Sequence, residues 1–281
     1  MKNLNGIEYL VGNKNISKRS VLPYDNNICD FLGDLSDELN SNSESKNYPD
    51  IKTLAFWCRR QNINNLKKKF LSNETRVGLG LIFHITPSNI PTNFAYSLIF
   101  GLITGNSNII KVPTQNFLQV GIICKSINKL LKKKHKSICK MISIVRYSDN
   151  DIYTKKISSI CSARLIWGGD NSIKNIRNFP LNQRALDIAF ADRYSFCVMN
   201  TSEVIKLGKK EIKRLVERFY NDTYLVDQNA CSSPHLVVWL GKKVDKARNK
   251  FWRHLHYHVN KKYILTETAS LDKYTQLCSH I

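Results

Sequence analysis

A cysteine on a predicted loop is the residue of this sequence whose setting best suits covalent chemistry. Cys231 lies in NDTYLVDQNACSSPH, residues 221–235, between an apolar helical pattern that ends at Phe219-Tyr220 and the apolar run Leu236–Leu240. The run after it is typical of a short buried strand, and catalytic groups are often carried on loops between packed elements. Its neighbours are small or polar, which leaves room for a substrate at the sulfur. Cys231 is therefore a candidate nucleophile; the alternative is an inert thiol, because free cysteine is most often buried.

Three other predicted loops carry candidate residues. Asn89 lies in PSNIP, Lys111 in IIKVP and Gly168-Gly169 in LIWGGD, and each follows an apolar run typical of a strand. Taken alone, Asn89 is a turn residue before Ile-Pro, Lys111 is an exposed strand-end lysine, and the glycines form a tight turn. In a doubly wound sheet, however, ligands bind at the carboxyl ends of the strands. We therefore expect these loops to line one edge of a sheet.

The elements that must position these residues alternate between strand and helix from Arg76 onward. Apolar runs predict strands at 77–85, 108–112, 141–147, 163–170 and 194–199; helical spacing predicts helices at 93–105, 117–131, 149–160 and 172–179, and a long helix capped by Thr201. This alternation is typical of a doubly wound, Rossmann-like α/β sheet. Residues 1–75 have helical spacing at 28–39 and 51–71 and form a predicted helical lead-in.

Several residues that could suggest other chemistry have simpler explanations. No G-x-G-x-x-G follows a predicted strand, and Gly78-Leu79-Gly80 lies inside the first one, so the sequence lacks the ordinary dinucleotide fingerprint. His84, on an apolar strand, is expected to be a satisfied core histidine. His235, close to Cys231, is not expected to act as a general base.

The composition favours a globular protein with a reduced interior. The chain has 281 residues, of which 42% are hydrophobic, and its start, MKNLNGIEYL, is too polar for a secretory signal peptide. No run approaches membrane-spanning length without a charge, so we expect a cytoplasmic protein. Eight cysteines without a C-x-x-C pair argue against a zinc ribbon or a thioredoxin-type site, and no metal site is predicted.

The net charge of +21 suggests nucleic acid or an anionic surface as a partner. The charge is spread out, however. Lysine runs at 67–69, 132–134 and 261–262 lie at the ends of helical patterns, where a solvated helix C-terminus explains them. No recognition-helix pattern or aromatic RNA-binding signature occurs. Nucleic-acid binding therefore ranks below an enzyme, and a positive field would equally favour a phosphorylated cofactor or substrate.

Five segments, in this order, resemble one enzyme family. HITPSNIPTNF, GLITGNSNIIKVP, LIWGGD, AFADRYSF and FYNDTYLVDQNACSSPH are similar to segments of the fatty acid reductases (LuxC-like acyl-CoA reductases) of the aldehyde dehydrogenase-like superfamily. The resemblance runs from about Gly78 to about Leu240, and DQNACSSPH is its most specific part. It implies NADPH-dependent reduction of a long-chain acyl thioester to a fatty aldehyde.

The resemblance implies a role for each candidate residue. Cys231 would attack the acyl carbonyl and form a thioester. The amide of Asn89 and the backbone N–H of Cys231 would form the oxyanion hole. Lys111 would contact the cofactor ribose or a 2′-phosphate, and Gly168 and Gly169 would lie near the cofactor phosphates at a helix start. Asp192-Arg193 would lie where aldehyde dehydrogenases carry a glutamate that activates water. The lack of this glutamate suits a reductase, because hydrolysis of the thioester would be a side reaction.

The resemblance also implies a division of the chain. Residues 76–225 would form a cofactor-binding α/β domain, and residues 226–281 the start of an incomplete catalytic domain, because the family chain is much longer after the cysteine. A C-terminally truncated relative, or a partial chain that binds cofactor without turnover, is the alternative to an active reductase. Expected partners are acyl-CoA or an acyl-carrying protein as substrate, an acyl-protein synthetase, and a further copy of the chain in a homo-oligomer. DKARNKFWRHLHYHVNKK is expected to form one basic amphipathic helix.

Overall fold

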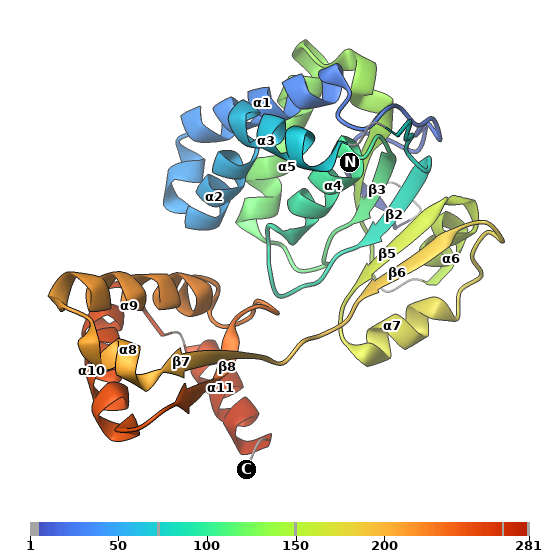
Figure 1. The fold of residues 1–281 in the computed structure, drawn as a ribbon. Helices are drawn as coiled ribbons and strands as arrows, with labels where there is room; N and C mark the ends of the chain where they lie inside the picture. The colour runs from blue at the N-terminus through green and yellow to red at the C-terminus, as the bar shows by residue number, and fades with distance from the viewer. Residues whose placement is uncertain (1–5, 72–73, 149–150, 266, 280–281) are drawn as a thin grey trace. The chain divides into compact units, whose positions relative to one another are not determined.

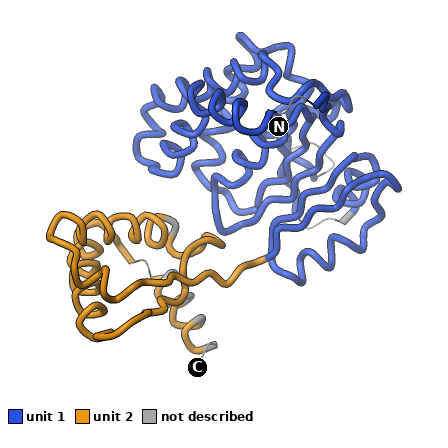
Figure 2. The backbone as a smooth tube through the Cα atoms, in the orientation of Figure 1, with its two compact units in different colours: residues 1–191 blue, residues 192–281 orange. Residues whose placement is uncertain are grey.

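The chain divides into two compact units, Met1–Ala191 and Asp192–Ile281 (Figure 2). The computed structural model describes residues 6–71, 74–148, 151–265 and 267–279. The boundary between the units differs from the boundaries after residues 75 and 225 that the sequence suggested. The reason for the first difference is packing: the helices of the first 75 residues share one hydrophobic core with the helices and strands that follow.

The first unit contains a six-stranded sheet in the order β1-β4-β3-β2-β5-β6 (Figure 1). Five strands are parallel: β2 Leu81–Ile85, β3 Ser107–Lys111, β4 Ile142–Arg146, β5 Ala163–Trp167 and β6 Leu186–Phe190. The sixth, β1 (Glu8–Val11), pairs antiparallel with β4. From β2 the chain moves outward through β3 and β4, then returns to the other side of β2 with β5. The predicted doubly wound topology is thus confirmed, with its switch point between β2 and β5.

Helices cover both faces of this sheet. Between the strands lie α4 (Asn93–Ile103), α5 (Leu118–Lys133), α6 (Asp151–Ile160) and α7 (Asp170–Arg177), with a short 3-10 helix, η2 (Lys136–Met141), after α5. The N-terminal helices are α1 (Asn26–Ser41), η1 (Glu44–Asn47), α2 (Pro49–Trp57) and α3 (Arg60–Phe70), and they pack beside α4 and α5.

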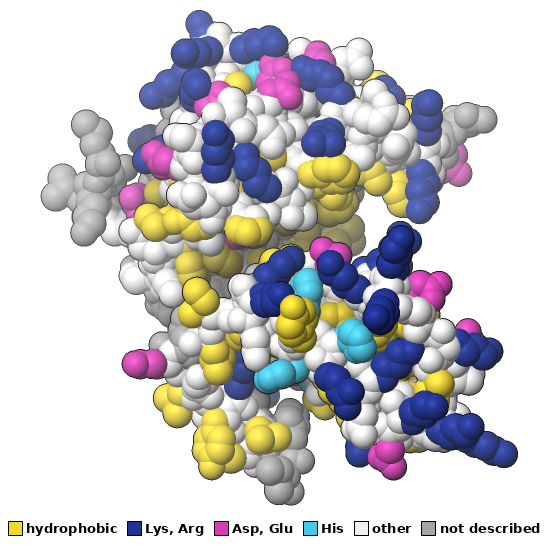
Figure 3. All heavy atoms as spheres, turned by 90° about the vertical axis from the view of Figure 1, so that its left-hand side faces the viewer, with side chains coloured by type: hydrophobic (Ala, Val, Ile, Leu, Met, Phe, Trp, Pro, Cys, Tyr) yellow, Lys and Arg dark blue, Asp and Glu magenta, His cyan; other side chains and the backbone are white. Residues whose placement is uncertain are grey.

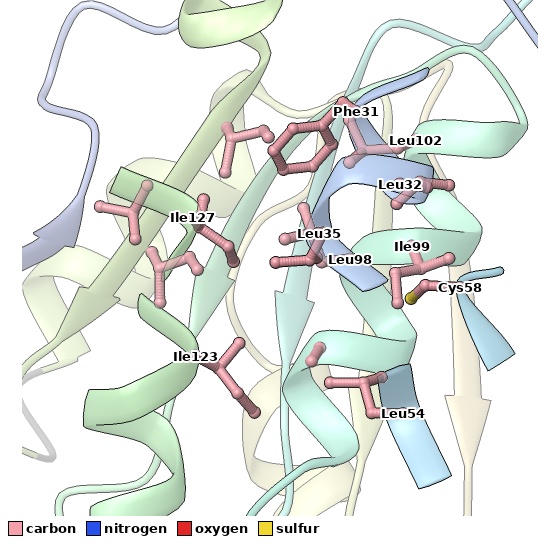
Figure 4. Close-up of a cluster of buried hydrophobic side chains, with 14 of the residues drawn as sticks. Phe31, Leu32, Leu35, Leu54, Cys58, Leu98, Ile99, Leu102, Ile123 and Ile127 are labelled. Carbon is pink, nitrogen blue, oxygen red and sulfur yellow. The ribbon is translucent and has the colours of Figure 1, made fainter. Parts of the chain in front are cut away.

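The alternation of side chains along the strands divides the interior into two cores, because successive residues of a strand point to opposite faces. Ile142 and Ile144 join the core formed with α1, α2, α4 and α5, which Figure 4 shows in close-up. Phe83, Ile109 and Val145 join the core on the other face, with residues of α6 and α7. Burial on both faces explains why these strands are almost continuously apolar.

The second unit is built on two parallel strands, β7 (Ser195–Asn200) and β8 (Pro234–Leu240). Its helices are α8 (Thr201–Lys206), α9 (Lys209–Thr223), η3 (Tyr224–Val226), α10 (Val244–Lys262) and α11 (Glu267–Ser279). One face of the strand pair packs with α8, α9 and α10, around Met199, Val216 and Phe251. The single basic helix predicted from DKARNKFWRHLHYHVNKK is confirmed as α10.

The sequence missed several boundaries. The long helix predicted from Thr201 is two helices, α8 and α9. The side chain of Asn200 caps α8 by accepting hydrogen bonds from the N–H groups of Ser202 and Glu203, and α9 starts after Gly208. The helix predicted at 51–71 breaks between α2 and α3, and the strand predicted from residue 77 begins only at Leu81. The sequence did not indicate β1 or β6.

The predicted burial of the strand after Cys231 is also wrong. Leu236 and Leu240 of β8 are 48% and 54% exposed, because the described residues cover only one face of the strand pair.

The positive charge is spread over the surface. Lys and Arg side chains are scattered among polar and hydrophobic ones on the face that Figure 3 shows. Lysines occupy the last turns of α3, α5 and α10, as predicted, where they oppose the partial negative charge of each helix C-terminus. Among the described residues, no helix has both the length and the apolar character needed to cross a membrane.

Candidate functional site

Three adjacent parallel strands carry the candidate residues of the first unit at their carboxyl ends. Lys111 ends β3 and is in register with Ile85, the last residue of β2, which also pairs with Ile166 near the end of β5. Asn89 lies on the loop after β2, and Gly168-Gly169 directly follows β5. The expectation that these residues line one edge of the sheet is confirmed, and that edge includes the topological switch point.

Thr86 fixes the start of the Asn89 loop. Its backbone N–H and its hydroxyl both donate to the carbonyl oxygen of Lys111, at 3.2 and 2.8 Å. The loop is therefore tied to the neighbouring strand at its first residue, while Asn89 itself is exposed. The arrangement presents Asn89 beyond the strand ends, outside the packed core.

The side chain of Lys111 is half-buried and lies against an aromatic ring. Its Nζ is 5.1 Å from the ring centroid of Tyr147, a distance typical of a cation–π contact. Tyr147 is itself buried and hydrogen-bonds through its hydroxyl to Thr154 at 3.0 Å. The ammonium group is thus held at the sheet edge by a ring that α6 anchors.

Gly168 and Gly169 form the passage from β5 into α7. The N–H of Gly168 donates to the carbonyl of Phe190 at 3.3 Å, so strand pairing continues to this residue, and Gly169 caps α7. A Cβ on Gly169 would meet no atom within 4 Å. The helix start is therefore open in front of Gly169.

Trp167 precedes the two glycines and stacks on Phe190, with ring centroids 4.0 Å apart. Its Nε1 is buried and has no hydrogen-bond partner among the residues described. A buried donor without a partner is costly, so it marks a place where a ligand oxygen would lower the free energy.

Cys231 lies in the second unit, on the turn between η3 and β8, and its side chain is exposed. The hydroxyl of Ser195, at the start of β7, donates to the carbonyl oxygen of Cys231 at 2.6 Å. Ser233 is fully buried; its N–H donates to Ala230 at 2.9 Å and its hydroxyl to the carbonyl of Asp222 at 2.7 Å. The backbone of the turn is therefore fixed on both sides of an accessible sulfur.

Three other cysteines are buried in the core. Burial raises the pKa of Cys58 and of Cys124 to about 12 and that of Cys161 to about 11. These groups stay protonated at neutral pH and cannot act as nucleophiles. Among the cysteines, only Cys231 and Cys278 are exposed in the part of the chain that the structure describes.

The position in the core that the sequence predicts for His84 is confirmed. His84 is fully buried, and its ring nitrogens hydrogen-bond to Ser97 at 2.8 Å and Asn108 at 2.9 Å. Burial lowers its pKa to about 4, against the opposing effect of the hydrogen bond to Asn108. His84 is thus a satisfied core histidine. His235 stacks on Tyr194, with ring centroids 5.4 Å apart.

Asn89 and Cys231 belong to different units, and the structure describes each unit by itself. Their proposed sharing of an oxyanion hole therefore stays a prediction, as do the roles of Lys111, Gly168 and Gly169. Asp192-Arg193 lies at the start of the second unit, where the N–H of Arg193 donates to the Asp192 carboxylate at 2.9 Å. Groups of three or more side chains suited to hold a metal ion do not occur among the described residues.

Two residues that the sequence did not indicate contact the turn directly before the Cys231 segment. Tyr263 and Lys273 bind Asp227, the second of them also Gln228, across 36 to 46 residues of chain. No spacing rule could have found them, because the contacts exist only once the chain after α10 has folded back onto the turn.

A comparison with protein-family models finds a match to acyl-CoA reductase (LuxC) over residues 32–273. A search of curated protein sequences finds no match. Many solved structures are similar in fold, and among them are aldehyde dehydrogenases.

Three of these structures indicate the extent of the likeness. An NAD-dependent benzaldehyde dehydrogenase from Corynebacterium glutamicum is 15% identical with a TM-score of 0.60, over 84% of this chain and 55% of that one. Aldehyde dehydrogenase 21 from Physcomitrella patens, in complex with succinate, is 11% identical with a TM-score of 0.60, over 85% and 53%. Glyceraldehyde-3-phosphate dehydrogenase GapN from Methanocaldococcus jannaschii, in complex with NADP, is 13% identical with a TM-score of 0.57, over 83% and 54%. The chain thus has an aldehyde dehydrogenase-like fold and spans about half the length of these structures.

Proposed function

The chain belongs to the acyl-CoA reductase (LuxC) family, and we propose that it catalyses the NADPH-dependent reduction of a long-chain acyl thioester to a fatty aldehyde. The observation that carries this proposal is the setting of Cys231: an exposed thiol on a turn whose backbone is held by Ser195 on one side and by the buried Ser233 on the other. A nucleophile needs both access and a fixed direction of attack.

The first step forms a thioester on the protein. The thiolate of Cys231 attacks the acyl carbonyl, and its sulfur forms a new bond to the carbonyl carbon. The bond from that carbon to the donor sulfur then breaks, and the donor leaves as a thiol after taking up a proton. Asn89 and the Cys231 N–H would donate to the negative oxygen formed in between, and each such donor is worth about 3–4 kcal/mol.

The residues at the edge of the first sheet fit a nicotinamide dinucleotide. The helix start after β5 is open in front of Gly169, and the neighbouring Nε1 of Trp167 has no protein partner among the described residues. Lys111 ends β3, which is separated from β5 by β2 alone. Such a cofactor would supply the hydride that converts the Cys231 thioester into the aldehyde and the free Cys231 thiolate. Lys111 would favour the 2′-phosphate of NADPH over NADH.

The donor and the assembly follow from the same proposal. The substrate would be acyl-CoA or an acyl-carrying protein, with an acyl-protein synthetase as supplier, in a cytoplasmic homo-oligomer. A second candidate function follows from the division of the candidate residues: Lys111, Gly168 and Gly169 lie at one sheet edge of the first unit, and Cys231 lies in the second unit. In that case the chain binds the cofactor without turnover.

The test measures aldehyde release and NADPH oxidation with a long-chain acyl-CoA for the wild type, Cys231→Ala and Cys278→Ala. The two cysteines are both exposed, so Cys278→Ala is a matched control. We expect Cys231→Ala to abolish aldehyde formation, Cys278→Ala to retain it, and Asn89→Ala to lower kcat by about 10²–10³-fold. Aldehyde formation by Cys231→Ala at the wild-type rate would refute the proposal. If the wild type forms no aldehyde but NADPH raises its Tm, the second candidate function holds.

A further inference from the structure

The turn before Cys231 has an unusual backbone. Asp227 and Gln228 are consecutive residues with φ of 52° and 60°, in the left-handed region. Neither is glycine, for which this region carries no steric penalty. Such a conformation persists only where the surrounding structure enforces it, and it is concentrated at functional sites.

Lys273 of α11 makes three contacts with these two residues. Its Nζ is 3.1 Å from the Asp227 carboxylate, 3.0 Å from the Asp227 carbonyl oxygen and 3.0 Å from Oε1 of Gln228. Both side chains of the ion pair are about two-thirds shielded from solvent, at 29% and 34% exposed. One ammonium group therefore binds the backbone of the turn and both of its side chains.

Tyr263 binds the same carboxylate from the segment between α10 and α11. Its hydroxyl donates a hydrogen bond to Oδ1 of Asp227. Its ring packs edge-on against the ring of Tyr224, which in turn stacks on Tyr220. Burial and the hydrogen bond to Asp227 raise the pKa of Tyr263. Tyr263 therefore keeps its proton and remains a donor over the whole physiological pH range.

These contacts lie directly before the nucleophile. The N–H of Gln228 donates to the carbonyl of Thr223 at 2.7 Å, so the turn closes back on the end of α9. The next turn of the chain carries Cys231, and the hydroxyl of Ser195 donates to the carbonyl oxygen of Cys231. A change in the conformation of Asp227 and Gln228 would therefore displace the start of the segment that carries Cys231.

We propose that Lys273 and Tyr263 are positioning residues that clamp the Asp227–Gln228 turn and thereby orient Cys231 for attack on the acyl carbonyl. The inference rests on the proposed function, since it takes Cys231 as the nucleophile. Neither residue touches the reacting atoms; both act through Asp227. The alternative is that the same contacts only attach α11 to the second unit, with no effect on Cys231.

The test uses the whole chain and two matched pairs of variants. Lys273→Met is compared with Lys261→Met, and Tyr263→Phe with Tyr257→Phe. The control residues, Lys261 and Tyr257, are exposed residues of α10 that form a hydrogen bond with each other. Lys273→Arg is the conservative variant, which keeps the charge and the donors. None of the altered residues is assigned to the catalytic or cofactor-binding groups.

The first measurement is amide hydrogen exchange over residues 227–233, in which Gln228 and Ser233 donate backbone hydrogen bonds. We expect exchange at these amides to be at least about tenfold faster in Lys273→Met and Tyr263→Phe, with β8 unchanged, and to be at the wild-type rate in both controls. Unchanged exchange in the turn overturns the inference, whether or not Cys231 is the nucleophile.

The second measurement is the rate at which a long-chain acyl-CoA acylates Cys231 in a single turnover. We expect the maximal rate to fall about tenfold in Lys273→Met and Tyr263→Phe, with little change in the half-saturating acyl-CoA concentration, and to recover in Lys273→Arg. Faster exchange with an unchanged acylation rate would show that the contacts only attach α11, and would overturn the positioning role. If the wild-type protein is not acylated at Cys231, the proposed function is refuted. The exchange measurement then still tests whether Lys273 and Tyr263 stabilise the Asp227–Gln228 turn.

Discussion

The buried arginine of β5 offers the most direct stability test of the sheet that carries Gly168 and Gly169. Arg164 is 1% exposed and forms two hydrogen bonds with Asp187 on β6, at 2.6 and 3.4 Å. Its remaining donors reach Ser158 on α6 and the carbonyl of Phe179 after α7, at 3.2 and 3.3 Å. One side chain thus joins two strands and the segments that cover them.

Replacing Arg164 with methionine keeps the apolar stem and leaves the Asp187 carboxylate without its main partner. Removing one member of a buried ion pair costs about 3–5 kcal/mol. Asp187 is 23% exposed and keeps Arg177 at 3.8 Å, so we expect the lower end, about 3 kcal/mol. Arg164→Met combined with Asp187→Leu should recover at least half of this loss, because no uncompensated charge then remains.

Urea denaturation followed by far-UV circular dichroism measures these changes. Arg177→Met is the control: Arg177 is 52% exposed and its contact is long, so its removal should cost less than about 0.5 kcal/mol. A loss below about 1 kcal/mol for Arg164→Met, or a double variant less stable than Arg164→Met, would show that the pair does not hold the sheet as described.

Two further predictions concern the buried polar cluster of His84, Ser97 and Asn108. The pKa of His84 is lowered from 6.5 to about 4, so the unfolded chain binds the proton first and stability falls as the pH drops through this window. At pH 4 the free energy of unfolding is lower by about 3 kcal/mol than at neutral pH because of His84 alone. His84→Gln should lack this part of the pH dependence. Equal profiles of unfolding free energy against pH for the wild type and His84→Gln would contradict the prediction. Gly101→Ala would place a Cβ 1.9 Å from Oδ1 of Asn108, so the Asn108 side chain must shift, which disturbs its hydrogen bond with His84. We expect a loss of about 1–3 kcal/mol in urea denaturation. Gly121→Ala in α5, whose Cβ would meet no atom within 4 Å, should be neutral or stabilising. Equal stability of the two alanine variants would refute the steric argument.

The sequence predicted the parts of the fold in which local pattern and tertiary burial agree. Strands β2, β3 and β4 are buried on both faces and therefore appear as apolar runs. β6 was missed because it contains Asp187, whose charge is compensated by Arg164 of the preceding strand and by Arg177 once the chain has folded. The break between α8 and α9 was missed because helical spacing of apolar residues continues across Gly208.

The same distinction applies to the candidate site. Asn89, Lys111, Gly168 and Gly169 could be placed at one sheet edge because each follows a recognisable strand, and topology then brings the strand ends together. The clamp on Asp227 could not be predicted, since Tyr263 and Lys273 are ordinary residues of a polar segment until the chain folds back. The exposed face of β8 was also unpredictable, because an apolar run looks the same whether one face or two are covered.

The central claim is that the sulfur at position 231 becomes acylated. Incubation of the wild-type chain with a long-chain acyl-CoA in the absence of reduced cofactor, followed by peptide mass spectrometry, measures this directly. We expect a hydroxylamine-sensitive acyl adduct on the peptide that contains Cys231 and no adduct at this site in Cys231→Ala. An adduct found on Cys278 instead, or none on any cysteine, would contradict it.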